Sequence, residues 1–279
     1  MDGVGVRPKH PDRSARARIG ASLLCLLAGC AQPAPTPPPT PALVRVLATD
    51  LTEPLALDLA LAYAADNPAV VVAPTLAEAG TLAGALSAGQ ADLALTVTPA
   101  PTQIGQAAAL FGTPLGYVPL TVVVNPANPL ATLPQAQAQA LFEGRVLEWS
   151  ALGAAGLGQV RVVARAPESD AGRAWAGQLW GPAAGTVTPN AVLAPTWVAM
   201  RTLVGDDPNA IGYVIGPRLD ETLKPLALTG ADGAAVTLQV LVVAVAAGEP
   251  SGAARGWLAW AQGAAGQAVV AQRHTALAP

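Results

Sequence analysis

The residue types that carry out covalent chemistry are scarce in this chain of 279 residues. Its two histidines are His10 and His274, and its two cysteines are Cys25 and Cys30. A nucleophilic triad needs a base, which is usually a histidine, and a zinc or thiol site needs several histidines or cysteines. Neither set is available, and the sequence has no P-loop motif. The sequence therefore predicts a protein that is not an enzyme and that needs no metal or cofactor.

The adjacent carboxylates Asp206 and Asp207 are the remaining candidates for acid–base work. They precede Pro208 and Asn209, which are residues typical of turns. We therefore interpret the two carboxylates as part of a turn.

Residues 1–29 have the organisation of a secretory signal peptide. A basic segment is followed by a short apolar run, which ends in small residues just before Cys30. The sequence Leu-Ala-Gly-Cys at 27–30 also resembles the bacterial lipobox, in which a peptidase cuts before the cysteine and the sulfur receives a diacylglycerol. Acyl chains would then hold the protein at a membrane, since each buried CH₂ contributes about 0.8 kcal/mol. An ordinary signal peptide with a chance cysteine is the alternative.

Residues 30–42 are rich in proline and read as a tether between this anchor and a folded body. Proline-rich sequence is extended and cannot donate to a helix or a sheet. The predicted location is therefore outside the cytoplasm, anchored to the cell membrane through a lipidated Cys30.

The charge of the body excludes nucleic acid as a partner. Beyond residue 29 the chain carries ten basic and sixteen acidic side chains. Such a surface repels phosphate backbones, whose neutralisation dominates nucleic-acid binding. Hydrophobic residues make up 52%, yet no apolar stretch reaches the roughly 18–20 residues of a membrane span.

Strand-like and helix-like segments alternate along the body, which predicts an α/β fold. The strands are expected at 43–49, 69–73, 91–97, 117–125, 160–164, 211–215 and 238–246. The helices are expected at 53–66, 81–87, 133–144, from Arg173 through Trp180, 255–262 and 267–273. Thr52 and Pro54 suit the start of the helix at 53–66.

Four stretches in this order resemble the phosphate-type substrate-binding proteins of ABC transporters. They are 122–129 (VVVNPANP), 141–153 (LFEGRVLEWSALG), 207–214 (DPNAIGYV) and 263–270 (GAAGQAVV). The family counterparts of the last three are IF-x-G-x-I-x-x-W-x-x-L-G, A-I-G-Y and S-x-x-G-Q-x-I-V.

The resemblance implies a two-lobed type II periplasmic-binding-protein fold. Each lobe would be a mixed, mostly parallel sheet flanked by helices, and two hinge strands near 117–124 and 237–243 would join the lobes. Lobe one would span 43–118 plus 238–279, and lobe two 119–237. The implied protein is a monomer that captures a small oxyanion, phosphate first, between its lobes and delivers it to an ABC permease.

Three loops are similar to the ligand-donor loops of that family. Ala48 to Leu55 aligns with G-S-T-T-x-x-P-L, Glu78 to Leu82 with G-S-G-x-G, and Arg165 to Arg173 with R-E-x-G-S-G-T-R. A further donor follows the strand at 91–97. The implied ligand-binding residues are Thr49, Asp50, Thr52, Thr81, Thr96, Arg165, Ser169, Asp170 and Arg173. Helix N-termini and arginine forks suit such an anion.

Two of these residues depart from the family pattern. Asp50 replaces a hydroxyl residue and Asp170 replaces a glycine. The two carboxylates could accept protons from a protonated oxyanion, or favour a cationic or polar solute. Asp50, Thr52, Ser169 and Asp170 would also serve as helix caps without any ligand, and Arg165 and Arg173 could pair with acidic neighbours on a solvated face.

The second functional hypothesis is a ligand-free sensory or scaffold lipoprotein on the same fold. Thermal stabilisation by a small ligand would favour the receptor. Exposed apolar patches built from the six tryptophans would favour the scaffold.

Overall fold

The computed structural model describes residues 40–98, 110–183 and 185–278. The predicted signal peptide, Cys30 and the tether as far as residue 39 lie outside the described residues. In the part of the chain that is described, no helix is long and apolar enough to cross a membrane.

The strands form one 11-stranded sheet. They are β1 (Ala42–Ala48), β2 (Val70–Leu76), β3 (Leu93–Thr98), β4 (Phe111–Val124), β5 (Thr132–Pro134), β6 (Arg161–Ala164), β7 (Val192–Leu193), β8 (Ala210–Ile215), β9 (Lys224–Thr229), β10 (Ala235–Val236) and β11 (Leu238–Ala246). The main order is β2-β1-β3-β11-β4-β8-β6-β7, and β9 joins β5 and β10 to β4.

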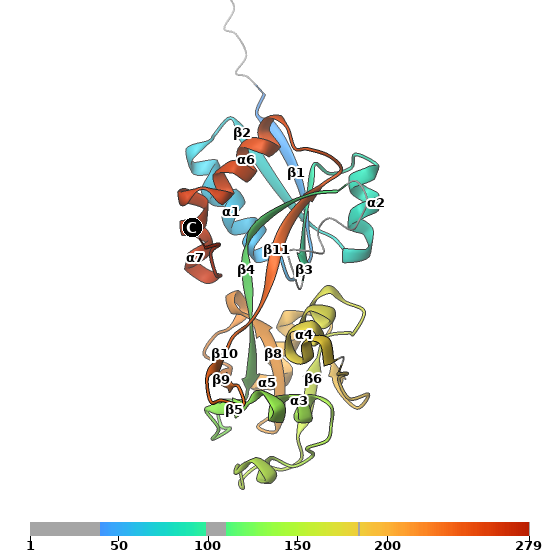
Figure 1. Cartoon of the computed structure of the whole chain (residues 1–279), viewed down its shortest axis with the longest axis vertical. Coiled ribbons are helices and arrows are strands. Elements are labelled where there is room, and N and C mark those ends of the chain that lie inside the picture. The colour runs from blue at the N-terminus through green and yellow to red at the C-terminus, as the bar shows by residue number, and fades with distance from the viewer. Residues whose placement is uncertain (1–39, 99–109, 184, 279) are drawn as a thin grey trace, which may run out of the picture. The chain divides into compact units, whose positions relative to one another are not determined.

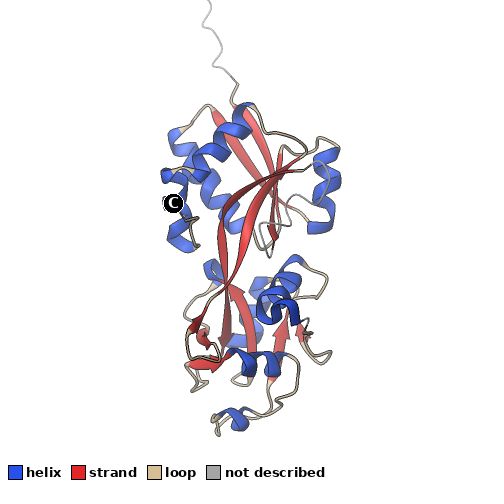
Figure 2. Ribbon diagram, in the orientation of Figure 1, coloured by secondary structure: helices blue, strands red, loops and turns tan. Residues whose placement is uncertain are grey.

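Seven α-helices and several short 3₁₀ turns accompany the strands in the described residues. They are α1 (Glu53–Asp66), α2 (Leu82–Ser87), α3 (Gln135–Phe142), α4 (Asp170–Trp180), α5 (Trp197–Gly205), α6 (Gly252–Gln262) and α7 (Ala264–Arg273), with η1 (Ala79–Thr81), η3 (Trp149–Leu152), η4 (Gly181–Ala183) and η5 (Gly216–Arg218). Figure 2 shows helices on either side of the strands β1 to β3.

Two groups of strands and helices make up the two lobes. Strands β1, β2 and β3 run parallel to one another, and β6 runs parallel to β7 and β8. Figure 1 shows the first group with α1, α2, α6 and α7, and the second with α3, α4 and α5. The predicted two-lobed fold with mixed sheets is therefore confirmed.

The antiparallel strands β4 and β11 run from one group to the other. They pair from Leu238 with Leu120 to Ala246 with Phe111. Within β11 the segment 241–245 also pairs with β3, and within β4 the segment 120–124 also pairs with β8. These two strands coincide with the predicted hinge strands, while the exact limits of the lobes stay a prediction.

A glycine is needed where β4 faces an irregularity of β11. The pairing register shifts between Val242 and Val243, and Gly116 opposite has φ +156°. A Cβ added at Gly116 would lie 2.7 Å from a Val270 methyl carbon and 3.1 Å from the carbonyl oxygen of Thr275. Glycine is the residue that tolerates both this backbone conformation and this close approach.

Buried apolar side chains of both lobes belong to one continuous core along the sheet. In the first, Val44 and Val46 of β1 are buried together with Leu55 and Leu59 of α1. In the second, Trp175 of α4 stacks on Tyr213 of β8 with ring centroids 4.1 Å apart. Five of the six tryptophans are buried, namely Trp149, Trp175, Trp180, Trp197 and Trp257. They therefore pack the interior rather than forming an exposed patch.

The sequence missed α5 and β9. Helix α5 has nine residues and buries three of them, so its apolar period is short. Strand β9 contains Pro225 and has no run of β-branched residues. The helix expected at 133–144 is shorter, because Leu133 and Pro134 belong to β5 and α3 starts at Gln135.

Candidate functional site

The turn after β1 holds Thr49, Asp50 and Thr52. The Thr49 amide donates to the Thr52 hydroxyl oxygen at 2.9 Å, and the Glu53 amide donates to the Thr49 carbonyl at 2.8 Å. The Thr52 hydroxyl in turn donates to the Leu95 carbonyl of β3 at 3.1 Å. Both threonines are buried. The turn is therefore fixed against the neighbouring strand before any ligand is considered.

The turn after β6 leads into α4. The Arg165 amide donates to the Tyr213 hydroxyl at 3.1 Å, and the Gly172 amide donates to the Ser169 hydroxyl oxygen at 3.0 Å. Ser169 is thus the N-cap of α4, and Asp170 is the first residue of the helix. A carboxylate there is favoured by the helix dipole.

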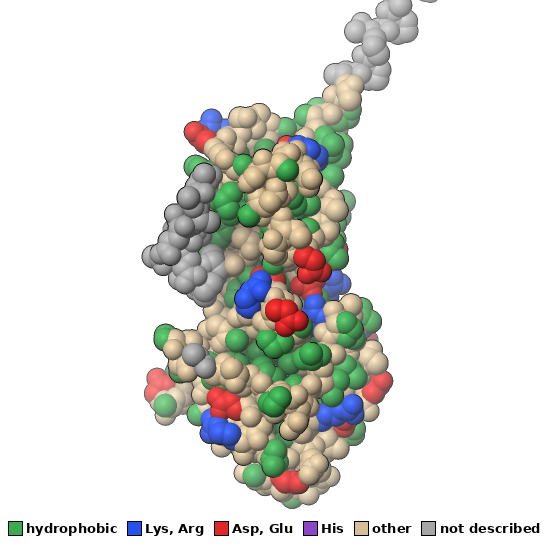
Figure 3. All heavy atoms as spheres, turned by 90° about the vertical axis from the view of Figure 1, so that its right-hand side faces the viewer, with side chains coloured by type: hydrophobic (Ala, Val, Ile, Leu, Met, Phe, Trp, Pro, Cys, Tyr) green, Lys and Arg blue, Asp and Glu red, His purple; other side chains and the backbone are tan. Residues whose placement is uncertain are grey.

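The two turns meet through their side chains. The Thr49 hydroxyl donates to Asp170 Oδ2 at 2.7 Å, and Arg165 Nη2 pairs with Asp50 Oδ2. Strands β1 and β6 stand far apart in the sheet, with β3, β11, β4 and β8 between them. The cluster therefore joins the two lobes, and Figure 3 shows acidic and basic side chains side by side in the zone where they meet.

Arg165 is 7% exposed and is held from several directions. Its Nη1 donates to the Ala194 carbonyl at 2.8 Å, and its Cζ lies 5.2 Å from the ring centroid of Trp197, within cation–π range. The Trp197 ring nitrogen donates to the Asp50 backbone carbonyl at 3.1 Å. Arg165 Nε is buried and, among the described residues, has no hydrogen-bond partner.

Burial governs the protonation of the two carboxylates. Burial raises the pKa of Asp50, and the Arg165 guanidinium partly offsets this rise. Burial also raises the pKa of Asp170, and the hydrogen bond from Thr49 partly offsets it. Burial disfavours the charged form of a carboxyl group, while a cation or a donor favours it. The cluster thus offers donors that already have acceptors, and carboxylates that would take up a proton more readily than exposed ones.

The structure brings together five of the nine predicted ligand residues, namely Thr49, Asp50, Thr52, Arg165 and Asp170. Thr96 comes directly after Leu95, whose carbonyl belongs to the cluster. Ser169 caps α4, as the ligand-free interpretation expected, whereas Thr52 occupies the N-cap position of α1 without a capping hydrogen bond. No comparison or contact tests a ligand role for these residues, so those roles stay predictions.

Two predicted residues, Thr81 and Arg173, make no hydrogen bond to the five residues of the cluster. The Thr81 hydroxyl is exposed and donates to the Glu78 carbonyl of its own loop at 2.8 Å. Arg173 donates to the Glu168 backbone carbonyl, and its charge partly offsets the rise in the pKa of Asp170 that burial causes. These hydrogen bonds are local and do not join the two lobes.

Sequence reasoning missed Trp197, Tyr213 and the ion pair between Glu53 and Arg218. That pair, at 3.2 Å, joins the start of α1 to η5 and so adds a contact between the lobes. Tyr213 belongs to the A-I-G-Y stretch, whose likeness to the family does not itself indicate a contact with Arg165. The signal for Trp197 was the preceding Thr196, whose hydroxyl accepts from the Ala199 amide and caps α5.

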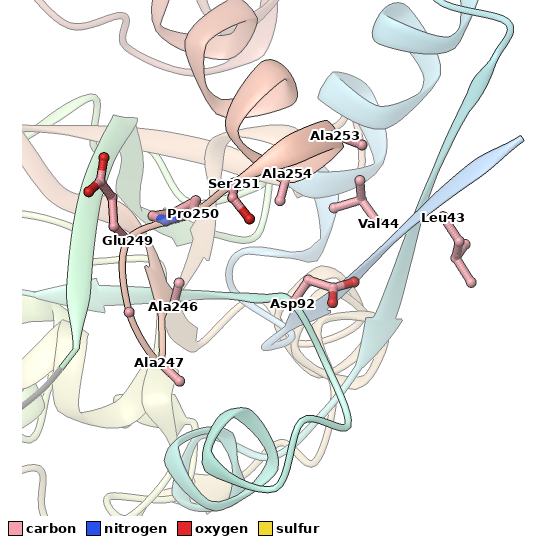
Figure 4. A pocket seen from close by; sticks show the side chains of 11 residues that line it. Leu43, Val44, Asp92, Ala246, Ala247, Glu249, Pro250, Ser251, Ala253 and Ala254 are labelled. Carbon is pink, nitrogen blue, oxygen red and sulfur yellow. The ribbon is translucent and has the colours of Figure 1, made fainter.

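Two surface pockets of the described residues lie away from the cluster. One, drawn in Figure 4, is lined by Asp92 and by residues 246–251. Because β1 and β3 are parallel, Asp92 before β3 and Asp50 after β1 lie at opposite ends of these strands. The other pocket includes Arg161 and Asp207 at the start of β6. Neither contains a predicted ligand residue.

Comparison with known proteins gives one family and several similar structures. The family model described as "PBP superfamily domain" matches residues 34–249. A structure from Clostridium perfringens, described as that of a phosphate ABC transporter substrate-binding protein with bound phosphate, has a TM-score of 0.72 at 19% identity and covers 85% of this chain and 100% of its own. An ABC-type phosphate transport receptor from Vibrio cholerae has a TM-score of 0.66 at 18% identity, covering 84% and 100%. No curated protein matches the sequence.

The fold also occurs in proteins with other names. A reduced form of OxyR from Neisseria meningitidis has a TM-score of 0.57 at 13% identity and covers 79% of this chain and 93% of its own. At these identities the likenesses establish the fold, and the nature of the ligand depends on the residues of the cluster.

The contact between Thr49 and Asp170 gives a stability prediction. Thr49→Val removes the hydroxyl that donates to a buried carboxylate, so we expect unfolding free energy to fall by about 1–3 kcal/mol at pH 7. Because burial raises the pKa of Asp170 in the native protein, ionised Asp170 lowers the free energy of unfolding at pH values above that pKa. This destabilisation disappears as pH falls toward the ordinary carboxyl value. Loss of the Thr49 donor increases the destabilisation, so the effect of the substitution should shrink toward pH 4.

Chemical denaturation of both proteins at pH 7 and pH 4 measures this difference. Thr81→Val is the matched control, because its hydroxyl is exposed and donates only within its loop. It should change stability by about 0.5 kcal/mol or less at either pH. Equal losses for the two variants would contradict the contact between Thr49 and Asp170.

Proposed function

Because this chain belongs to the PBP superfamily, we propose that it is the solute-binding protein of an ABC import system. It holds a small oxyanion where its two lobes meet, and phosphate is the preferred candidate. The observation that carries the proposal is the junction of the turns after β1 and β6, with its buried Arg165 and Thr49 and the starts of α1 and α4. Guanidinium forks, hydroxyls and helix N-termini are the donors that suit an oxyanion.

The carboxylates of the junction favour an oxyanion that carries a proton. Asp50 and Asp170 lie beside the donors and could each accept a hydrogen bond only from a protonated ligand oxygen. Near neutral pH phosphate still carries a proton, whereas sulfate carries none. A fully ionised anion would meet the two carboxylates as like charges, which disfavour binding. We therefore place phosphate ahead of sulfate, molybdate and tungstate.

Similarity supports the same function. The structures from C. perfringens and V. cholerae are named as phosphate receptors of ABC transporters, and this chain covers each of them completely. In this account the protein binds and releases a solute unchanged, acts as a monomer, and presents the closed lobes to a permease. Closure of two lobes about hinge strands is a common response to a ligand.

We further propose that Cys30 anchors the protein outside the cytoplasm. A lipidated cysteine followed by a proline-rich tether would keep the body close to a permease. Expression of the full chain in a bacterium, followed by separation of membranes, tests this proposal. The wild type should be found in the membrane fraction, and Cys30→Ser should move to the soluble fraction or keep an uncut signal peptide. Unchanged processing and membrane association of the variant would contradict the anchor.

A ligand-free sensory or scaffold lipoprotein is the second candidate. One observation favours it, namely that Asp50 and Asp170 already accept from Arg165 and Thr49. Such a protein would show no stabilisation by any small anion.

Thermal unfolding with and without phosphate distinguishes the two candidates. A ligand at 100 times its Kd stabilises the native state by about 2.7 kcal/mol, so phosphate should raise the Tm and sulfate at the same ionic strength should not. Arg165→Gln should remove the effect of phosphate.

Arg145→Ala is the control for the loss of one positive charge. Arg145 is exposed and pairs with Glu143 away from the junction, so this variant should retain the full phosphate response. If no oxyanion raises the Tm of the wild type, or if Arg165→Gln responds like the wild type, the proposed site is wrong.

A further inference from the structure

We infer that Asp50 is an internal competitor of the ligand: its carboxylate occupies Arg165 in the unliganded protein, and the anion must displace it to bind. The inference rests on the proposed function. It adds that Asp50 sets the affinity of the site, and that the receptor is tuned to bind its anion more weakly than its donors alone would allow.

The competition follows from what Arg165 contacts. Its side chain is 8% exposed, and the carboxylate paired with it among the described residues is that of Asp50. Its other hydrogen-bonded group, Nη1, meets the neutral carbonyl of Ala194. A buried cation needs a compensating charge, and an incoming anion supplies the same charge as Asp50 does. The two therefore compete for one guanidinium.

The side chain of Asp50 is free to leave the site, whereas that of Asp170 is held in place. The Asp50 side chain is 29% exposed, so it can rotate into solvent when it leaves Arg165. Its backbone is held meanwhile, because the Trp197 ring nitrogen donates to its carbonyl. Asp170 is 9% exposed, begins α4 and accepts from Thr49. Asp170 can thus stay as an acceptor for a ligand proton after Asp50 has been displaced.

The same pair explains how the unliganded lobes are held together. Asp50 follows β1 in one lobe and Arg165 follows β6 in the other. The carboxylate acts between them as a tethered substitute for the ligand. The wild type must spend binding free energy to break this pair, and a variant without the carboxylate does not. Removal of the charge should therefore tighten binding.

Isothermal titration of phosphate into the full-length protein tests the inference. Asp50→Asn should lower the Kd by about tenfold, which corresponds to 1.4 kcal/mol. The control is Asp92→Asn, which also removes one negative charge from an Asp–Arg pair, with Arg45, at the opposite end of the strands. It should leave the Kd within about twofold. Asp50→Ser, which replaces the carboxylate with a hydroxyl, should also tighten binding and serves if Asp50→Asn fails to fold.

Each outcome bears on the inference. Tighter binding by the Asp50 variants alone supports it. Weaker or unchanged binding by them, while the wild type binds, overturns the inference and leaves the proposed function standing, because Asp50 would then be an ordinary ligand contact or a bystander. If Asp92→Asn tightens binding equally, the effect comes from the net charge of the protein, and the inference is overturned as well. No binding by the wild type or by any variant overturns both the inference and the proposed function.

Discussion

The buried positive charge of Arg165 is the constraint on which the site depends. A cation removed from water must meet a compensating anion, since an unpaired buried charge is strongly destabilising. In this protein the anion comes from Asp50, which is 115 residues away along the chain. The requirement therefore brings the turns after β1 and β6 together, and it places a carboxylate where an oxyanion receptor would hold its ligand.

The rest of the fold makes this pairing possible while leaving it reversible. Strands β4 and β11 pair along their length and connect the lobes, so the two turns stay within reach of each other when side-chain contacts break. Several polar contacts also join the lobes, among them Thr49 with Asp170, Trp197 with the Asp50 carbonyl and Glu53 with Arg218. Polar groups can exchange such contacts for hydrogen bonds to water, which suits surfaces that must separate.

Local sequence signals predicted the parts of this arrangement that depend on neighbouring residues. The bounds of α1 were predicted to the residue, with Thr52 and Pro54 marking its start, and the cap offered as the alternative role of Ser169 is present. The pairing of Asp50 with Arg165 could not be predicted, because nothing in either turn specifies a partner so distant. Trp197 was missed with α5, whose short apolar pattern gives little helical signal. The departures at Asp50 and Asp170 were visible in the sequence, but only the structure shows that they meet the arginine and the threonine expected to bind the ligand.

Crystal structures of the protein grown with and without phosphate test the central claim most directly. Without phosphate we expect the Asp50 carboxylate on Arg165. With phosphate we expect the anion between the two turns, in contact with Arg165, and the Asp50 side chain turned away. An intact pair between Asp50 and Arg165 at saturating phosphate, with the anion bound elsewhere or not at all, would contradict the account.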